Sequence, residues 1–442
     1  MKQFEEFVLD DWVEYTQKQH WRTIELKLDR IRDVWANMDG SKPNFVITVA
    51  GTNGKGSSVS MLDAVLLQAG KKTGAYTSPH LVRYNERIKI NGVPVSDEEI
   101  CLGFCAIEKA RKSIPLTYFE FGTLCALWVF IRNNVDIAIL EVGMGGRLDA
   151  VNMIENDIAL ITTIDIDHQQ WLGTDKEKIG AEKAGIIKPG GLVVCADPEA
   201  PVSIGETASR VGATLFQVGV DFVVEDRHDG ISWSCNDSAL SNEWKHVEQI
   251  NLPLTGKYQI RNFAGVLAVL ALIEKRIGVT TDDLRLALQS VNIPGRCQVV
   301  SKEPELIIDV AHNRQSATEL AKFLALRPHT NSQSGKTLVV LGVLADKALK
   351  EIIGEIMGSV DIWYLATLGG DRGQSAADLL RKLAQVNREI SPHRVLKAAI
   401  FDSPVEAYNA AMSDAAKTDR VVVFGSFYTV GDIMKHTNML TT

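Results

Sequence analysis

A glycine-rich turn with a single lysine lies early in the chain, between an apolar run and an amphipathic stretch. The run at 45–50 predicts a buried strand, and 57–69 predicts a helix with one apolar face. Glycines let backbone N–H groups approach a phosphate, a helix N-terminus adds positive potential, and lysine supplies charge. In the standard phosphate loop serine or threonine directly follows the lysine, whereas here a glycine intervenes. Phosphate binding is favoured over a simple tight turn, and the predicted loop is Gly51, Thr52, Asn53, Gly54, Lys55, Gly56 and Ser57.

Two further polar residues follow predicted strands of the same sheet. Glu141 comes directly after the run at 136–140, and His168 follows the run at 158–164. Ligands of open parallel sheets bind beyond the carboxyl ends of the strands, so both residues are expected to share a crevice with the loop. Oxygen ligands suit magnesium, and one imidazole is tolerable beside them. Each residue alone has a structural reading, but their shared placement predicts a metal site.

Lys183 is a less obvious candidate. A helix predicted at 176–187 places Ile179, Lys183 and Ile187 on one face. A lysine on an apolar face tends to lose its proton, and the neutral amine can react. A surface lysine that lays its stem along apolar neighbours is the alternative, which the spacing alone favours.

The elements that position these residues alternate short apolar runs with amphipathic stretches, the pattern of a parallel sheet flanked by helices. Asn91-Gly92 predicts the turn of a hairpin. Short alternating segments predict a small antiparallel sheet farther along the chain, before the next helix. The ranges are 87–95 for the hairpin, 215–254 for the small sheet and 260–275 for the helix.

A second series of strands and helices begins near Gln298, after a segment at 292–296 in which proline and glycine interrupt both patterns. We therefore predict two α/β domains. Residues 1–296 would form an N-terminal P-loop ATPase domain with a parallel sheet and a small antiparallel subsheet. Residues 297–442 would form a C-terminal Rossmann-like domain, with strands at 306–310, 337–341, 361–366 and 420–424.

Composition narrows the class of protein. The 442 residues are 45% apolar and 23% charged, which is typical of globular domains and too long for one ordinary core. The net charge of −8 argues against a nucleic-acid surface, and no run approaches the about 20 apolar residues that cross a bilayer. The six cysteines form no C-x-x-C pair; Cys101 and Cys105 could suggest a metal, but reduced thiols of a cytoplasmic protein are favoured. A monomer is the default expectation.

An ordered set of motifs resembles the folylpolyglutamate synthases, and most closely the bifunctional bacterial enzymes that also make dihydrofolate. The resemblance runs from about residue 20 to residue 430. Its motifs are the loop at 51–57, Tyr76-Thr77-Ser78-Pro79-His80, Glu141-Val142-Gly143-Met144-Gly145-Gly146-Arg147-Leu148-Asp149, His168, Glu182-Lys183-Ala184-Gly185, Pro294-Gly295-Arg296, Asp309-Val310-Ala311-His312-Asn313 and Gly425-Ser426-Phe427.

The resemblance implies a role for each matching residue. Magnesium would be held by Ser78, Glu141 and His168, and Lys183 would be carbamylated, which turns its amine into a metal-binding carboxylate. ATP would contact Asn262, Arg296 and Asp309 across a domain cleft. The pterin substrate would lie against Glu25, Leu26, Thr117, Tyr118, Phe119, Glu120, Leu148, Asp149 and Ala150. Glu25 and Lys27 stand where relatives often have Asp and Gly, so the pterin loop is expected to differ.

The predicted function is an ATP-dependent amide ligase. It would add L-glutamate to dihydropteroate and to tetrahydrofolates through an acyl phosphate, with Lys55 and magnesium neutralising the transferred phosphate. His312 is the candidate base for the amine, and a monovalent cation is a further expected cofactor without an identified site. The alternatives are a Mur-type cell-wall ligase, which would need a nucleotide-sugar domain before Gly51, and an ATP-hydrolysing switch that works without glutamate.

Overall fold

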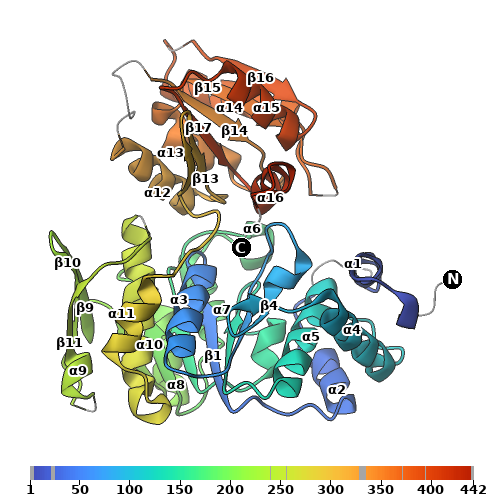
Figure 1. Ribbon diagram of the computed structural model, residues 1–442, viewed down its shortest axis with the longest axis vertical. Helices are drawn as coiled ribbons and strands as arrows, with labels where there is room; N and C mark the ends of the chain where they lie inside the picture. Colours follow the sequence, from blue (N-terminus) through green and yellow to red (C-terminus); the bar gives the residue numbers. More distant parts are fainter. Residues whose placement is uncertain are drawn as a thin grey trace. The chain divides into compact units, whose positions relative to one another are not determined.

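The computed structural model describes residues 4–20, 25–238, 240–254, 256–327, 335–370, 372–393 and 395–439. The chain divides into two compact units. The first comprises Met1–Pro253 and Tyr258–Val291, and the second comprises Leu254–Lys257 and Asn292–Thr442. Each unit is an α/β layer structure with its own sheet, as the sequence predicts (Figure 1).

The first unit is built on an eight-stranded sheet in which six consecutive strands, including one edge strand, are parallel. Two antiparallel strands, β3 and β4, extend one edge as the predicted hairpin. Because β1 lies between β5 and β6, three predicted ligand-bearing segments leave neighbouring strands at the same end. In spatial order the strands are β4 (Val93–Pro94), β3 (Ile88–Ile90), β2 (Thr73–Tyr76), β5 (Ile137–Glu141), β1 (Phe45–Ala50), β6 (Ile158–Ile161), β7 (Leu192–Cys195) and β8 (Thr214–Gln217).

Helices cover both faces of this sheet because alternate residues of a strand point to opposite sides. On β2, Gly74 packs so tightly under α5 that an added Cβ would lie 2.6 Å from the Phe130 ring. Tyr76, two residues farther along the strand, also faces α5, whereas the Thr73 side chain lies near Asp63 of α3. The helices are α1 (Leu9–Gln17), α2 (Asp29–Asn37), α3 (Lys55–Gln68), α4 (Asp97–Arg111), α5 (Tyr118–Arg132), α6 (Gln169–Leu172), α7 (Lys176–Ala184), α8 (Val202–Val211), α9 (Asn242–Lys245), α10 (Lys257–Ile277) and α11 (Thr281–Leu288), with short 3-10 turns η1 (Phe4–Glu6), η2 (Tyr84–Arg87) and η3 (Ala150–Met153).

Several predicted bounds in this unit differ from the structure; the helix predicted at 57–69, for example, is Lys55–Gln68, and the strand predicted at 136–140 is Ile137–Glu141. Three further differences concern the site or the small sheet. The strand predicted at 158–164 ends at Ile161, because the chain then turns to contact the phosphate loop. The helix predicted at 176–187 ends at Ala184, so Ile187 lies beyond it although it is buried. The segment predicted at 215–254 as an antiparallel sheet begins with part of β8, which instead pairs in parallel with β7.

The small antiparallel sheet itself is present. Its order is β11 (His246–Ile250), β10 (Gly230–Cys235) and β9 (Phe222–Arg227), and both ladders are antiparallel. Trp233 and Trp244 are almost completely buried there, which gives this short sheet an apolar core.

The second unit has a six-stranded sheet that is parallel except for the edge strand β12. Its central strands are apolar and fully buried, as expected for a sheet covered on both faces. In spatial order the strands are β12 (Gln298–Lys302), β13 (Glu305–Ile308), β17 (Arg420–Phe424), β14 (Thr337–Leu341), β15 (Ile362–Ala366) and β16 (Ala398–Phe401). The helices are α12 (Arg314–Ala325), α13 (Leu349–Ile356), α14 (Ala376–Ile390), α15 (Pro404–Asp414) and α16 (Phe427–His436), with a 3-10 turn η4 (Met357–Ser359). Across the described parts of both units, none of the helices has the length and apolar character that a membrane crossing requires.

Candidate active site

The phosphate loop leaves β1 and enters α3, whose first residue is Lys55. Two of its glycines have positive φ, 152° at Gly51 and 88° at Gly54. A side chain would collide at either position: an added Cβ would lie 1.7 Å from Thr162 Oγ1 at Gly51, and 2.1 Å from Asn262 Oδ1 at Gly54. Glycine is therefore required here both by the backbone and by its neighbours.

The segment after β6 holds the loop in place. Thr52 N donates to the Thr163 carbonyl at 2.7 Å, and Thr52 Oγ1 donates to the Asp165 carbonyl at 2.9 Å. Thr162 Oγ1 donates to the Asn53 carbonyl at 2.7 Å. Because these bonds join the ends of two neighbouring strands, the protein itself holds the loop in this conformation.

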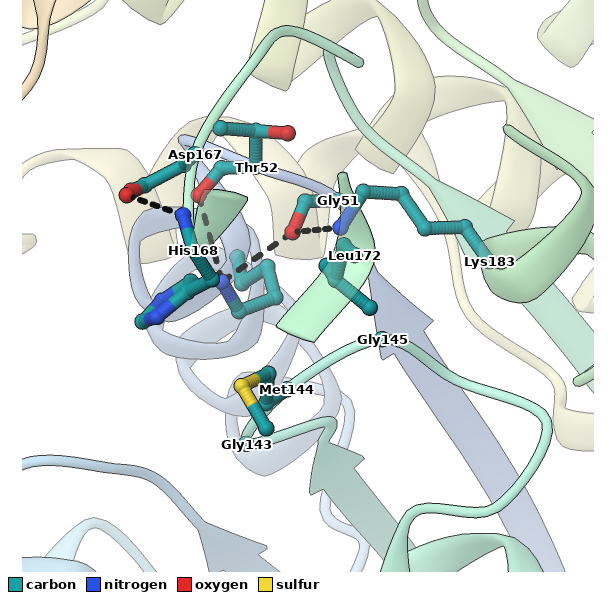
Figure 2. A pocket seen from close by; sticks show the side chains of 10 residues that line it. Gly51, Thr52, Gly143, Met144, Gly145, Asp167, His168, Leu172 and Lys183 are labelled. Atoms are coloured by element: carbon teal, nitrogen blue, oxygen red, sulfur yellow. Dashed lines mark hydrogen bonds between the residues drawn. The ribbon is translucent and has the colours of Figure 1, made fainter. Parts of the chain in front are cut away.

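Two lysines converge on one carbonyl of this loop (Figure 2). Lys55 Nζ donates to the Gly51 carbonyl at 3.1 Å and to the Thr52 carbonyl at 3.3 Å, and Lys183 Nζ donates to the same Gly51 oxygen at 2.9 Å. Burial, and after it the charge of Lys55, lower the pKa of Lys183 to about 7, while Asp167 and Asp149 oppose the shift. A substantial fraction of this amine is therefore uncharged near neutral pH.

The two lysines, Gly51 and Thr52 of the loop, and His168 line one pocket. Its wall also contains residues that the sequence analysis did not single out. Asp167 is the important one, because it is buried beside Lys183 and its carboxylate accepts the His168 backbone N–H at 2.7 Å. It belongs to the run Asp165-Ile166-Asp167-His168, so a strand-end carboxylate was a visible signal. The lining residues are Gly51, Thr52, Lys55, Gly143, Met144, Gly145, Asp167, His168, Leu172 and Lys183.

The predicted magnesium ligands follow three parallel strands, β2, β5 and β6. Glu141 ends β5, is almost completely buried, and accepts the backbone N–H of Ser78 at 3.1 Å. A Cβ on Gly56 would be 3.5 Å from Glu141 Oε2, so the glycine after Lys55 leaves space beside this carboxylate. His168 has positive φ (51°) and caps α6 at the pocket.

These donors fit a hard divalent cation. A carboxylate, a hydroxyl and one imidazole suit magnesium, and the space beside Gly56 is bounded by carboxylate oxygen. Within the described chain, no cluster of three or more His, Cys, Asp and Glu side chains could hold a metal ion. The predicted set contains only two residues of these kinds, Glu141 and His168, so its other donors would be Ser78 and modified Lys183.

Asp149 connects the turn at residues 143–146 to the start of η3. Its carboxylate accepts the N–H groups of Met144 at 2.8 Å and Val151 at 3.1 Å. The pKa of Asp149 is raised to about 7, because the effect of burial exceeds the opposing effects of these backbone hydrogen bonds and of the Lys55 charge. Leu148 is half-buried and Ala150 is the buried first residue of η3, so these predicted substrate residues flank the same turn.

The remaining predicted substrate residues of the first unit gather at the start of α5. Thr117 and Glu120 form a capping box, in which each side chain bonds to the backbone of the other. The Phe119 ring packs on Gly143, and the Tyr118 ring lies under the Arg87 guanidinium at 5.2 Å. Glu25 contacts Arg30, which also binds Glu120, and Leu26 is half-buried beside Glu25.

The predicted residues of the second unit form a separate cluster. Buried Asp309 accepts the N–H groups of Cys297 and Ala311, both at 2.7 Å. Burial raises the pKa of Asp309, and the nearby Arg296 charge opposes the shift. Arg296 and His312 both lie against the ring of Phe427. The Arg296 guanidinium carbon is 5.3 Å from the Phe427 ring centroid, and the His312 ring centroid is 6.1 Å from it. Asn262 lies beside Gly54 in the first unit.

Known proteins resemble the chain over almost its entire length. The Mur ligase middle domain matches residues 49–270, and the Mur ligase glutamate ligase domain matches residues 295–427. The dihydrofolate synthase/folylpolyglutamate synthase of Escherichia coli is 40% identical over 428 residues, which cover 97% of this chain and 95% of that protein.

Two solved structures are similar in fold and sequence. E. coli FolC in complex with DHPP and ADP has a TM-score of 0.89 and 38% identity, with 99% of each chain covered. A bifunctional folylpolyglutamate synthase/dihydrofolate synthase with Mn, AMPPNP and L-glutamate bound has a TM-score of 0.87 and 38% identity, also over 99% of each chain. The chain therefore belongs to the dihydrofolate synthase/folylpolyglutamate synthase family of Mur ligases.

Proposed function

We propose that this chain is an ATP-dependent ligase that joins the carboxylate of dihydropteroate, and of tetrahydrofolates, to the amine of L-glutamate. The observation that carries the proposal is the convergence of Lys55 and Lys183 on the Gly51 carbonyl at the glycine-rich loop. A carboxylate does not form an amide in water without activation, and a phosphate-binding loop beside charged groups can provide activation by ATP. The nucleotides and L-glutamate bound by the similar solved proteins support this reading.

The reaction would proceed in two steps. A carboxylate oxygen of the acceptor attacks the γ-phosphorus of ATP, the bond to the bridging oxygen breaks, and ADP leaves. Lys55 neutralises charge that develops on the transferred group. The uncharged glutamate amine then attacks the acyl carbon and phosphate leaves with the bonding electron pair. His312 is the candidate to accept the proton that the amine releases.

Ser78, Glu141 and His168 would hold magnesium, together with a carbamylated Lys183. When bound, the ion supplies positive charge that neutralises the phosphate oxygens. Carbamylation requires the uncharged amine, which the lowered pKa of Lys183 favours. Nζ attacks the carbon of CO2, a C–N bond forms, one proton is lost to solvent, and the product carries a carboxylate. A monovalent cation is a further proposed cofactor.

The other predicted residues would bind the two larger substrates. ATP would contact the loop at 51–57 together with Asn262, Arg296 and Asp309. The pterin acceptor would occupy the region of Glu25, Leu26, Leu148, Asp149 and Ala150, and the start of α5 at 117–120. We propose functional domains at 1–296 and 297–442 on this basis.

We also propose that the enzyme is a cytoplasmic monomer. All six cysteines are free, which suits a reducing compartment. The mass of the purified protein in solution, measured by light scattering, tests the monomer.

Phosphate release from ATP by the purified protein tests the function. The expected result is release with glutamate plus dihydropteroate, and with glutamate plus tetrahydrofolate, and none when glutamate is omitted. Release without glutamate would instead identify an ATP-hydrolysing switch. If neither dihydropteroate nor tetrahydrofolate supports phosphate release, the folate assignment is contradicted, and cell-wall acceptors should be assayed next.

A further inference from the structure

A cluster of charged side chains joins the N-terminal segment to the start of α5. Arg30 of α2 is at its centre: NH1 lies 2.7 Å from Glu25 Oε2, NH2 donates to the Glu25 carbonyl at 3.1 Å, and Nε donates to Glu120 Oε2 at 3.0 Å. His20 Nε2 and Lys27 Nζ also contact Glu25, at 2.9 and 3.1 Å. The side chains of Glu25, Arg30 and Glu120 are only 12, 14 and 4% exposed.

Three of the four carboxylate oxygens in this cluster are held by donors from the protein. For Glu25, Arg30 lies at Oε2 and Lys27 at Oε1. For Glu120, Arg30 Nε and the backbone N–H and hydroxyl of Thr117 donate to Oε2 at 3.0, 2.8 and 2.9 Å. Buried Oε1 lies 2.9 Å from Arg30 Nε but accepts no hydrogen bond from the described residues. The two acids are therefore engaged in contacts within the protein.

The cluster is connected to the pocket by packing. Glu120 closes the capping box that begins α5, and this first turn carries Phe119. The Phe119 ring lies so close to Gly143 that an added Cβ there would be 2.5 Å away, and Gly143 lines the pocket with the two lysines. A displacement of the first turn of α5 would therefore move the turn at 143–146, which Asp149 ties to the proposed acceptor residues Leu148–Ala150.

We propose that Arg30 is a positioning residue for the carboxylate acceptor, and that Glu25 and Glu120 act through it without touching the substrate. The proposal rests on the proposed function and refines the roles of these two acids. A guanidinium has donors in a planar fork and can join two carboxylates at once, whereas a lysine amine is a single point. Arg30 thus fixes the segment at 25–28 and the first turn of α5 in one arrangement.

The first test is the Arg30→Gln variant, with Arg32→Gln as a matched control because Arg32 is exposed on the same helix. We expect Arg30→Gln to raise KM for dihydropteroate by about 10- to 100-fold, with kcat, and KM for ATP and glutamate, changed by less than about 2-fold. Arg32→Gln should leave all constants unchanged. Arg30→Lys, which retains the charge, should fold normally and give an intermediate KM, so that loss of folding in Arg30→Gln does not decide the result.

A double-mutant cycle separates positioning from direct contact. If Glu25 acts through Arg30, Glu25→Gln should raise the acceptor KM in the wild type but by less than about 2-fold in the Arg30→Gln background. An equal effect in both backgrounds would show that Glu25 touches the acceptor and would overturn the proposal. So would an unchanged acceptor KM in Arg30→Gln, or an equal rise in KM for ATP. Wild-type protein inactive on both acceptors would overturn the proposed function itself, and with it any acceptor role of Arg30.

Discussion

The two units each use one buried aspartate to tie a loop, but they place it among different cations. Asp149 binds the N–H groups of Met144 and Val151, and Asp309 binds those of Cys297 and Ala311. Burial raises the pKa of both carboxyl groups. In each unit, therefore, one buried carboxylate accepts hydrogen bonds from two backbone N–H groups.

The cations decide what each aspartate can do. Asp149 interacts with Lys55 and with Lys183, whose pKa is lowered by burial to about 7. Asp309 interacts with Arg296, and an arginine keeps its charge throughout the accessible pH range. The first unit therefore contains groups whose charge can change near neutral pH, whereas the arginine of the second supplies a constant charge. Activation of the phosphate is therefore expected in the first unit, and Arg296 is expected to supply a fixed binding charge in the second.

Among the substitutions that test this comparison of the two units, replacement of Lys55 should cause the largest loss of activity. Lys55→Ala removes a permanent charge from the phosphate loop, and we expect a loss of about 10³-fold in kcat, since one preorganised charge is removed from the transferred phosphate. Phosphate release at saturating substrates measures it. Retention of more than a tenth of the activity would show that Lys55 is not the neutralising charge. The thermal midpoint serves as a folding control.

Replacement of Lys183 should reduce activity and increase stability at the same time. Lys183→Met is expected to lower kcat by about 10²-fold, because the amine whose carbamylation would supply a magnesium ligand is lost. The same change should stabilise the fold by up to about 4 kcal/mol, since a buried ionisable group is replaced by an apolar one.

The increase in stability expected for Lys183→Met should depend on pH, because the fold lowers the pKa of Lys183. The fold lowers the pKa of Lys183 from 10.5 to about 7, so holding a proton in the fold is unfavourable below pH 7 and the effect disappears as pH rises toward 10.5. The advantage of Lys183→Met should therefore be greatest below pH 7. Denaturant unfolding in CO2-free buffer at several pH values measures it, and a gain that grows with pH would contradict the assignment.

A comparison of alanine substitutions at two glycines with similar φ distinguishes the effect of backbone strain from the effect of moving the phosphate loop. Gly54→Ala and Gly70→Ala both place a side chain at positive φ (88° and 73°), but only Gly54 has a neighbour, Asn262, in the way. We expect Gly70→Ala to lower the free energy of unfolding by about 1 kcal/mol and leave activity unchanged. Gly54→Ala should also raise KM for ATP by about 10-fold, as the loop is displaced. Equal kinetic constants in the two variants would show that the Asn262 contact is unimportant.

The smallest expected effect concerns Asp149. Its pKa rises from 3.8 to about 7 on folding, so the native state binds more protons between these values and stability falls as pH rises through that window. Asp149→Asn removes this titration and one acceptor, at a cost of about 1 kcal/mol. The difference in unfolding free energy from the wild type should be larger at pH 5 than at pH 8. A difference that does not vary with pH would show that Asp149 does not titrate in this range.

The sequence predicts strands best where tertiary contacts are not needed to explain them. The buried strands β1, β14 and β17 have their predicted bounds because each is a continuous apolar run between polar segments. The strand β6 ends early because Thr163 pairs with Asn53 of the phosphate loop, a residue 110 positions away. The helix α7 ends at Ala184, next to Gly185, which packs on Arg147 so closely that an added Cβ would be 2.2 Å away.

Site prediction has the same limit. The loop at 51–57 could be identified from its residue types, and the positions of Glu141 and His168 from the ends of apolar runs. No local spacing indicates that Arg30 lies beside Glu120, 90 positions away, or that Asn262 lies beside Gly54. Asp167 was visible in the sequence but was not singled out, because its value depends on the buried amine of Lys183 beside it.

The contact between Lys183 and Gly51 spans 132 positions, and it has a consequence for how the protein folds. A chain emerging from the ribosome carries the whole phosphate loop long before α7 exists, so the nascent loop cannot acquire its second lysine. Contacts of such separation require loop closure first, which makes this sheet slow to complete. Because ATP would bind only the finished arrangement, it would act as a stabilising ligand of the native state and shift the balance away from partly folded chains.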